Sequence, residues 1–144
     1  MTAPRPTSDP ALAAGAVLGG RYRLEALVAR GGASEVYRAT DVTLGRDVAV
    51  KVVALDAAAA LEREASMLAL TGAPQVPACY DRGIEDRVAY LVMEYVPGPN
   101  LAQALDAGPA LPEVARRWAA AATRVVEAVQ ARGVVHGDLK PSHF

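Results

Sequence analysis

The sequence predicts an α+β fold, in which a five-stranded antiparallel sheet with one helix is followed by a helical segment. Three observations lead to this prediction. From Gly20 to about Glu94 the apolar residues mostly alternate as they do in strands, apart from one helical stretch. A group of turn residues, "VPGPN", then breaks the pattern. Beyond it the apolar spacing is helical as far as Gly133.

The expected strands are runs of apolar and β-branched residues that end at turn residues. They span residues 22–29, 34–41, 46–54, 78–85 and 87–95. The stretch 60–70 is the expected helix of the sheet region, because the stop signals Gly72 and Pro74 follow it.

The helical segment begins with Leu101 and Leu105, which lie one helical turn apart. A long helix is expected from about Pro112, and Gly133 is its stop signal.

Three regions are expected along the chain. Residues 1–19 have three prolines among the first ten and no periodic apolar face, which predicts a flexible tail. Residues 20–96 would form the sheet with its helix, and residues 97–144 the helical segment.

Composition argues against several classes of function. The net charge of the 144 residues is −1 and the pI is about 6.1, so nothing favours nucleic acid or an anionic membrane as a partner. The single cysteine, Cys79, cannot form an intramolecular disulfide and suits a reducing cytoplasm. No apolar run reaches the roughly 18 residues of a membrane span. We therefore expect a cytoplasmic protein without a membrane segment.

A lysine and a glutamate stand out because each falls on an apolar face. Lys51 lies in the valine-rich run 46–54, where a buried ammonium group needs a partner. Glu64 shares its helix face with Leu61 and Ala65, by the i, i+3, i+4 spacing. The spacing is compatible with an ion pair between Lys51 and Glu64. The alternative is an edge strand whose lysine reaches water.

The stretch "VARGGASEVYRA" places two glycines between two expected strands. Glycines let backbone N–H groups approach an anion closely, as a phosphate site requires. A plain hairpin turn is the alternative. The order of a glycine loop, a buried lysine and an inward glutamate favours the phosphate site.

These stretches together resemble a known family. "VARGGASEVYRATD", "VAVK", "EREA", "YLVMEYVPGPNL" and "VVHGDLKP" occur in the order found in the eukaryotic-like serine/threonine protein kinases of bacteria. The resemblance runs from about Gly20 to Phe144. It implies a kinase small lobe over residues 20–96, which binds ATP, and the start of the large lobe over residues 97–144.

The resemblance implies a role for each residue of the phosphate site. Gly31, Gly32 and Ser34 would form the loop over the ATP phosphates. Lys51 would hold the α- and β-phosphates, and Glu64 would orient it.

On the adenine side, the resemblance implies that Val36 and Ala49 pack on the upper face of the ring. Met93 would be the gatekeeper beside the pocket. The Glu94 carbonyl and the Val96 amide would hydrogen-bond the adenine edge.

The resemblance also assigns the catalytic loop. Asp138 would accept the proton of the attacking hydroxyl, and Lys140 would steady the transferring phosphate. Gly137 stands where many members have an arginine that pairs with a phosphorylated activation loop, so we expect no such switch.

Magnesium ligation is where the sequence departs most from the family. The family places a magnesium-binding asparagine five residues after the catalytic aspartate, and this chain has His143 there. Magnesium prefers oxygen ligands, so an imidazole is a poor replacement. The Asp-Phe-Gly motif that supplies the other ligand is absent from the 144 residues.

The expected function is therefore ATP- and Mg²⁺-dependent phosphorylation of serine or threonine in a protein substrate, and the chain is expected to be a kinase fragment. Two alternatives remain open. One is a pseudokinase or a non-catalytic nucleotide-binding or docking module. The other is a small-molecule phosphotransferase, a class in which "HGD" also occurs.

Overall fold

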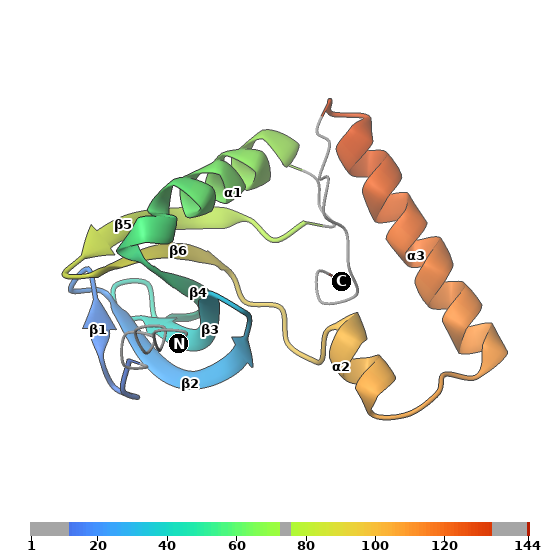
Figure 1. The fold of residues 1–144 in the computed structure, drawn as a ribbon, viewed down its shortest axis with the longest axis horizontal. Coiled ribbons are helices and arrows are strands. Elements are labelled where there is room, and N and C mark those ends of the chain that lie inside the picture. Colours follow the sequence, from blue (N-terminus) through green and yellow to red (C-terminus); the bar gives the residue numbers. More distant parts are fainter. Residues whose placement is uncertain (1–11, 73–75, 134–143) are drawn as a thin grey trace, which may run out of the picture. The chain divides into compact units, whose positions relative to one another are not determined.

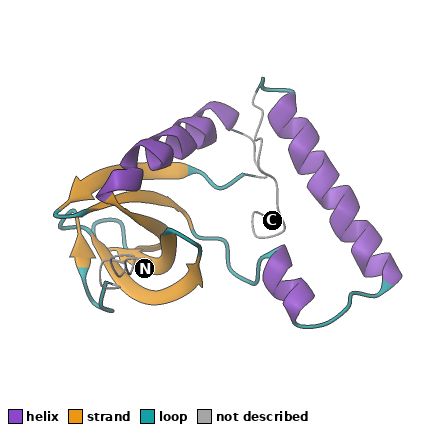
Figure 2. Cartoon of the chain, viewed as in Figure 1, coloured by secondary structure: helices purple, strands orange, loops and turns teal. Residues whose placement is uncertain are grey.

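The computed structural model describes residues 12–72, 76–133 and 144, and the chain divides into two compact units (Figure 1). The first unit comprises residues 1–66 and 78–95, and the second comprises residues 67–77 and 96–144. Strands belong to the first unit, whereas the second is helical (Figure 2).

The first unit is built on one antiparallel sheet of six strands in the order β1-β2-β3-β4-β6-β5. The strands are β1 (Val17–Leu18), β2 (Tyr22–Arg30), β3 (Ser34–Asp41), β4 (Arg46–Ala54), β5 (Cys79–Glu85) and β6 (Val88–Glu94). The predicted antiparallel sheet is confirmed, and the five expected strands are present with ends that differ by no more than one residue.

Strand β1 is the one strand of the sheet that was not predicted, and it shows that the expected flexible tail does not extend to residue 19. Val17 and Leu18 pair with Arg23 and Tyr22, and Leu18 is buried. Leu12 also packs against the core. A strand of two residues is too short for the period of two to be recognised in a sequence.

A hydrophobic core cluster lies on one face of the sheet and follows from the alternation of side chains along each strand. In β4 it takes Val48, Val50 and Val52, each at most 6% exposed. Strands β1, β2, β3 and β6 add the other large members, which are Leu18, Tyr22, Leu24, Tyr37, Tyr90 and Val92. The residues between them in β4, Ala49, Lys51 and Val53, therefore face the opposite side.

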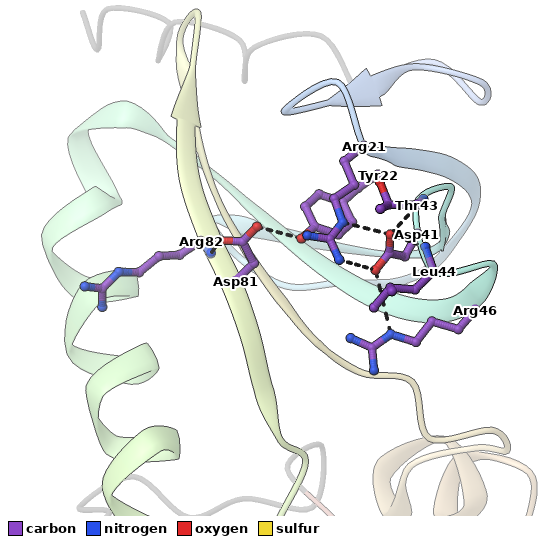
Figure 3. Close-up of polar contacts among 8 residues, drawn as sticks. All are labelled: Arg21, Tyr22, Asp41, Thr43, Leu44, Arg46, Asp81 and Arg82. Carbon is purple, nitrogen blue, oxygen red and sulfur yellow. Dashed lines mark hydrogen bonds and ion pairs between the residues drawn. The ribbon is translucent and has the colours of Figure 1, made fainter.

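A polar cluster holds the β3–β4 turn against the neighbouring strand β2 (Figure 3). The carboxylate of Asp41 is fully buried, and Arg21 donates two hydrogen bonds of 2.8 Å to it. The backbone amides of Thr43 and Leu44 donate to the same carboxylate at 3.1 and 3.2 Å. Arg46 places its Nε 3.7 Å from it. Asp41 thus hydrogen-bonds Arg21 and the turn, whereas the buried Arg46 Nε lies only within ion-pair distance and has no hydrogen-bond partner in the described structure.

The helix of the sheet region, α1 (Ala58–Thr71), follows a short 3-10 turn, η1 (Leu55–Ala57). It turns Leu61 and Ala65 onto the sheet, where they are 5% and 1% exposed. The helix starts two residues before the predicted start at 60. Alanines at the start explain the difference, because they favour helix without contributing to an apolar pattern.

The second unit contains α2 (Leu101–Asp106) and α3 (Pro112–Gln130). Asn100 caps α2 through a reciprocal capping box with Gln103. Pro112 is the first residue of α3, where its missing N–H costs nothing. Neither helix, nor any other in the described part of the chain, is long and apolar enough to cross a bilayer.

Candidate nucleotide site

Lys51 and Glu64 form the centre of the candidate site. The Lys51 Nζ lies 2.7 Å from the Glu64 Oε2, so the predicted ion pair is present. The two side chains are 24% and 40% exposed. Because β4 lies between β3 and β6, it is not an edge strand and the alternative prediction is wrong. The lysine instead lies on the sheet face opposite the core, half-buried beside α1.

The glycine loop joins β2 to β3 as a tight turn. The Gly31 amide donates a hydrogen bond of 2.8 Å to the Ser34 carbonyl, and both Gly31 and Gly32 are exposed. A Cβ on Gly31 would lie 3.1 Å from the Ser34 Oγ, whereas one on Gly32 would meet nothing within 4 Å. The turn therefore needs glycine more at its first position than at its second.

A cavity of about 160 Å³ brings the loop and the ion pair together. Its walls come from the loop, the start of β3, from β4, and from η1 and the first turns of α1. They are Ala33, Ser34, Lys51, Val53, Ala57, Ala60, Leu61 and Glu64. An ammonium group and the end of a glycine turn beside one cavity can hold an anionic group such as phosphate. The sequence-based prediction missed Ala33 and Val53. Val53 alternates with Lys51, so the strand period is the signal that could have found it.

Three of the predicted adenine residues, Val36, Ala49 and Met93, lie on the same sheet face as Lys51. Val36 is directly opposite Lys51 across β3 and β4, and Ala49 is opposite Met93 across β4 and β6. Ala49 is buried and Met93 is half-buried. Because of this pairing, Val36, Ala49 and Met93 form an apolar surface next to the Lys51–Glu64 ion pair. Whether it takes adenine is part of the proposal below.

Glu94 ends β6, and its backbone amide donates to the Ala78 carbonyl at 2.8 Å. Its carboxylate accepts a hydrogen bond of 3.2 Å from the Ala78 amide. Val96, the remaining adenine residue of the prediction, belongs to the second unit and is 59% exposed.

Cys79 lies opposite Met93 in the β5–β6 pair, so the one thiol of the chain is next to the predicted gatekeeper. Burial raises the pKa of the Cys79 thiol, which keeps it neutral. A neutral, half-buried thiol acts here as a small apolar residue.

The predicted catalytic and metal residues, Asp138, Lys140 and His143, lie outside the described residues. Among the residues that the structure describes, no group of three or more His, Cys, Asp or Glu side chains could hold a metal ion.

Comparisons of the sequence with known proteins point to the protein kinase domain. The model of the protein kinase domain matches residues 22–144. A probable serine/threonine-protein kinase of Streptomyces coelicolor is 40% identical over 137 residues, which are 88% of this chain and 20% of that protein.

Two further relatives are also named as serine/threonine-protein kinases. The serine/threonine-protein kinase PrkC of Bacillus subtilis is 34% identical over 88% of this chain and 21% of its own length. PknB of Mycobacterium leprae is 36% identical over 88% of this chain and 22% of its own length. The chain spans about a fifth of the length of these curated relatives. The chain therefore belongs to the protein kinase family, and the relatives it matches are bacterial serine/threonine kinases.

Proposed function

We propose that this chain binds ATP through its first unit and is the nucleotide-binding part of a protein kinase that phosphorylates serine or threonine. The observation that carries the proposal is the Lys51–Glu64 ion pair of 2.7 Å beside the glycine turn and its cavity. Three similar proteins are named as serine/threonine-protein kinases, which supports the same class of substrate. A cytoplasmic location, where ATP is available, is part of the proposal.

The residues of the half-buried site would bind a nucleotide through hydrogen bonds to its phosphates and apolar contact with its base. Lys51 donates to phosphate oxygens, and Glu64 holds the ammonium group in place so that less entropy is lost on binding. The Gly32 amide can add a further donor, whereas the Gly31 amide is already bound to the Ser34 carbonyl. Val36, Ala49 and Met93 offer apolar contact to the base.

The roles of the residues that would act on the substrate hydroxyl and the transferring phosphate are inferred from the sequence. Asp138 would take the proton from the serine or threonine hydroxyl, and Lys140 would neutralise charge on the transferring phosphate. Magnesium, when bound, supplies charge neutralisation between the phosphates. His143, in the place of an oxygen ligand, fits this ion poorly. This misfit favours the second candidate function, a pseudokinase or nucleotide-binding module.

Nucleotide binding can be tested on the 144-residue chain by titration with ATP in a calorimeter. We expect Lys51→Met to weaken binding by at least about tenfold, because a charged hydrogen bond to phosphate is lost. Arg87→Met, which removes an exposed charge in the β5–β6 turn, is the matched control. Equal affinity of wild type and Lys51→Met would refute the site.

Phosphotransfer can be tested separately with radiolabelled ATP and a generic basic protein. We expect the 144-residue chain to show no transfer above background, because it contains neither the Asp-Phe-Gly aspartate nor an asparagine at position 143. Transfer that Asp138→Asn abolishes would show that these residues form a complete catalyst and would remove the pseudokinase alternative.

A further inference from the structure

The pairing of β2 with β3 is irregular just below the glycine turn. Leu27 lies opposite Tyr37, but the next pair is Ala29 with Val36, so β2 has one residue more than β3 at this point. Such a bulge disrupts the regular ladder of backbone hydrogen bonds and bends the strand that carries it. Across residues 29–36, all of which the structure describes, two pairs of the ladder remain between the bulge and the turn.

The two strands are unequally supported next to the turn. Strand β3 is paired with β4 on its other side as far as Ser34, which lies opposite Val53. Strand β1 is the other neighbour of β2, and it pairs with Arg23 and Tyr22 at the far end of that strand. The end of β2 that carries Arg30 is therefore held to the sheet by β3.

A network of side chains spans this end of β2. The Glu35 carboxylate accepts a hydrogen bond of 3.0 Å from the Arg30 Nε, and the Arg30 Nη2 lies 2.9 Å from the same oxygen. The other carboxylate oxygen accepts a hydrogen bond of 2.6 Å from the Tyr37 hydroxyl. Arg30 lies between the bulge and the turn, whereas Tyr37 lies on the far side of the bulge and belongs to the core cluster. Glu35 thus connects the end of β2 to the core.

Tyr37 fixes the orientation of the Glu35 carboxylate. Burial and the hydrogen bond to Glu35 raise the pKa of Tyr37 to about 12, so the hydroxyl keeps its proton at neutral pH. The hydroxyl also lies 3.4 Å from the Leu12 carbonyl, but its single proton is directed to the nearer Glu35. A carboxylate that is already anchored loses less side-chain entropy when it holds a cation. This offsets the 60% exposure of the Arg30 side chain, which by itself would make the ion pair weak.

We propose that Glu35 is a positioning residue for the glycine turn: it holds the end of β2, and with it the two glycines, beside the cavity lined by Lys51. The proposal rests on the nucleotide site proposed above for its effect on ATP. The turn is next to that cavity because Ser34 is one of the cavity walls and Val36 lies opposite Lys51. A turn that is already in place binds phosphate with a smaller loss of conformational entropy than a turn that must be ordered first.

Strands β2 and β3 carry a second network of the same type, which provides a matched control. Glu25 accepts hydrogen bonds of 2.9 Å from the Arg23 Nε and 2.8 Å from the Thr40 hydroxyl. Its side chain is 30% exposed, compared with 24% for Glu35. Arg23 and Thr40 lie opposite each other at the end of the strand pair away from the turn. Loss of this network should therefore affect the fold without affecting the turn.

The first test compares the affinities of ATP and adenosine for the 144-residue chain by calorimetry. We expect Glu35→Gln and Tyr37→Phe each to raise the dissociation constant of ATP about two- to fivefold, because the turn must then be ordered on binding. Adenosine has no phosphate, so its affinity should not change. Glu25→Gln should change neither affinity. An unchanged ATP affinity in Glu35→Gln or Tyr37→Phe, an equal loss in Glu25→Gln, or an equal loss for adenosine overturns the proposal.

The second test needs no nucleotide. Hydrogen exchange, followed by mass spectrometry of peptides that contain the Gly31 amide, reports how often its 2.8 Å hydrogen bond to the Ser34 carbonyl opens. We expect Glu35→Gln to speed this exchange about two- to tenfold and Glu25→Gln to leave it unchanged. Equal exchange in Glu35→Gln and wild type would show that Glu35 does not hold the turn. A wild-type chain that binds no ATP would refute the proposed function and leave this exchange to decide the role of Glu35.

Discussion

At the scale of single residues, Asp41 is the one charged residue that is buried in the described part of the chain. Its carboxylate is fully buried and accepts hydrogen bonds from Arg21 and from two backbone amides of the β3–β4 turn. The hydrogen bonds from Arg21 lower the pKa of Asp41 from 3.8 to about 2, against the opposing effect of burial. Removing one partner of a buried pair leaves the other without compensation.

This pKa predicts how stability depends on pH. A carboxyl group whose pKa is lowered by folding stabilises the native state above its unfolded pKa, and this contribution is lost as pH falls through the folded value. Asp41 should therefore stabilise the fold fully above about pH 4 and lose its effect toward pH 2. We expect Asp41→Asn to lower the melting temperature at pH 7 by on the order of 5 °C, and to differ less from wild type at pH 2.

Circular dichroism melts of both proteins between pH 2 and pH 7 check this prediction. Asp47→Asn is the control, because Asp47 is exposed and lies 3.9 Å from Arg38. If Asp41→Asn melted like wild type at pH 7, the cluster would make no measurable contribution to stability.

At the scale of elements, the pairing of β5 with β6 includes one position where only glycine fits. Gly83 lies opposite Tyr90 in the sheet, and a Cβ on Gly83 would collide with the Tyr90 hydroxyl and ring. Tyr90 in turn packs edge-on against Tyr22, with ring centroids 6.3 Å apart. The aromatic ring occupies the space that a side chain at position 83 would need.

We expect Gly83→Ala to destabilise the chain by about 1–3 kcal/mol, because an extra methyl group in a packed site forces its neighbours to move. Gly32→Ala is the matched control, since a Cβ there meets nothing within 4 Å and the residue has no positive φ. Urea unfolding monitored by tyrosine fluorescence gives both values. Equal stability of the two variants would mean that Tyr90 moves aside at no cost.

The elements also show what sequence can and cannot predict. Strands β2 to β6 and helix α3 were predictable because apolar periods and stop signals were clear over seven or more residues. The Lys51–Glu64 pair was predictable because both charges interrupt apolar faces. The ion pair of 2.9 Å between Arg82 of β5 and Glu62 of α1 gave no such signal, since an exposed arginine in an alternating strand is ordinary. Glu62 is twenty residues away from Arg82, and only the packing of α1 on β5 brings them together.

At the scale of the whole molecule, α3 presents an apolar side that the described structure leaves accessible. None of its residues, all of which are described, is buried. Val114, Trp118, Val125 and Val129 are half-buried along one side of the helix. Contiguous apolar area of this kind favours association between molecules.

We therefore expect the 144-residue chain to self-associate at high concentration. Replacing Val125 and Val129 by glutamine should shift it toward monomer, because both side chains contribute to the apolar side of α3. Arg116→Gln, on an exposed position of the same helix, should leave the association unchanged. Light scattering after size exclusion measures the mass of each. A monodisperse wild-type monomer at high concentration would contradict the prediction.

The strand order has a consequence for synthesis on the ribosome. Strand β4 pairs with β6, although β5 follows β4 in the chain. When the residues up to Glu85 have left the exit tunnel, one edge of β4 is therefore still unpaired and β5 has no partner strand. The valines of β4 stay uncovered on that side until residue 94 has left the exit tunnel. We expect this interval to be when chaperones bind the chain, and a pause in translation there to favour aggregation.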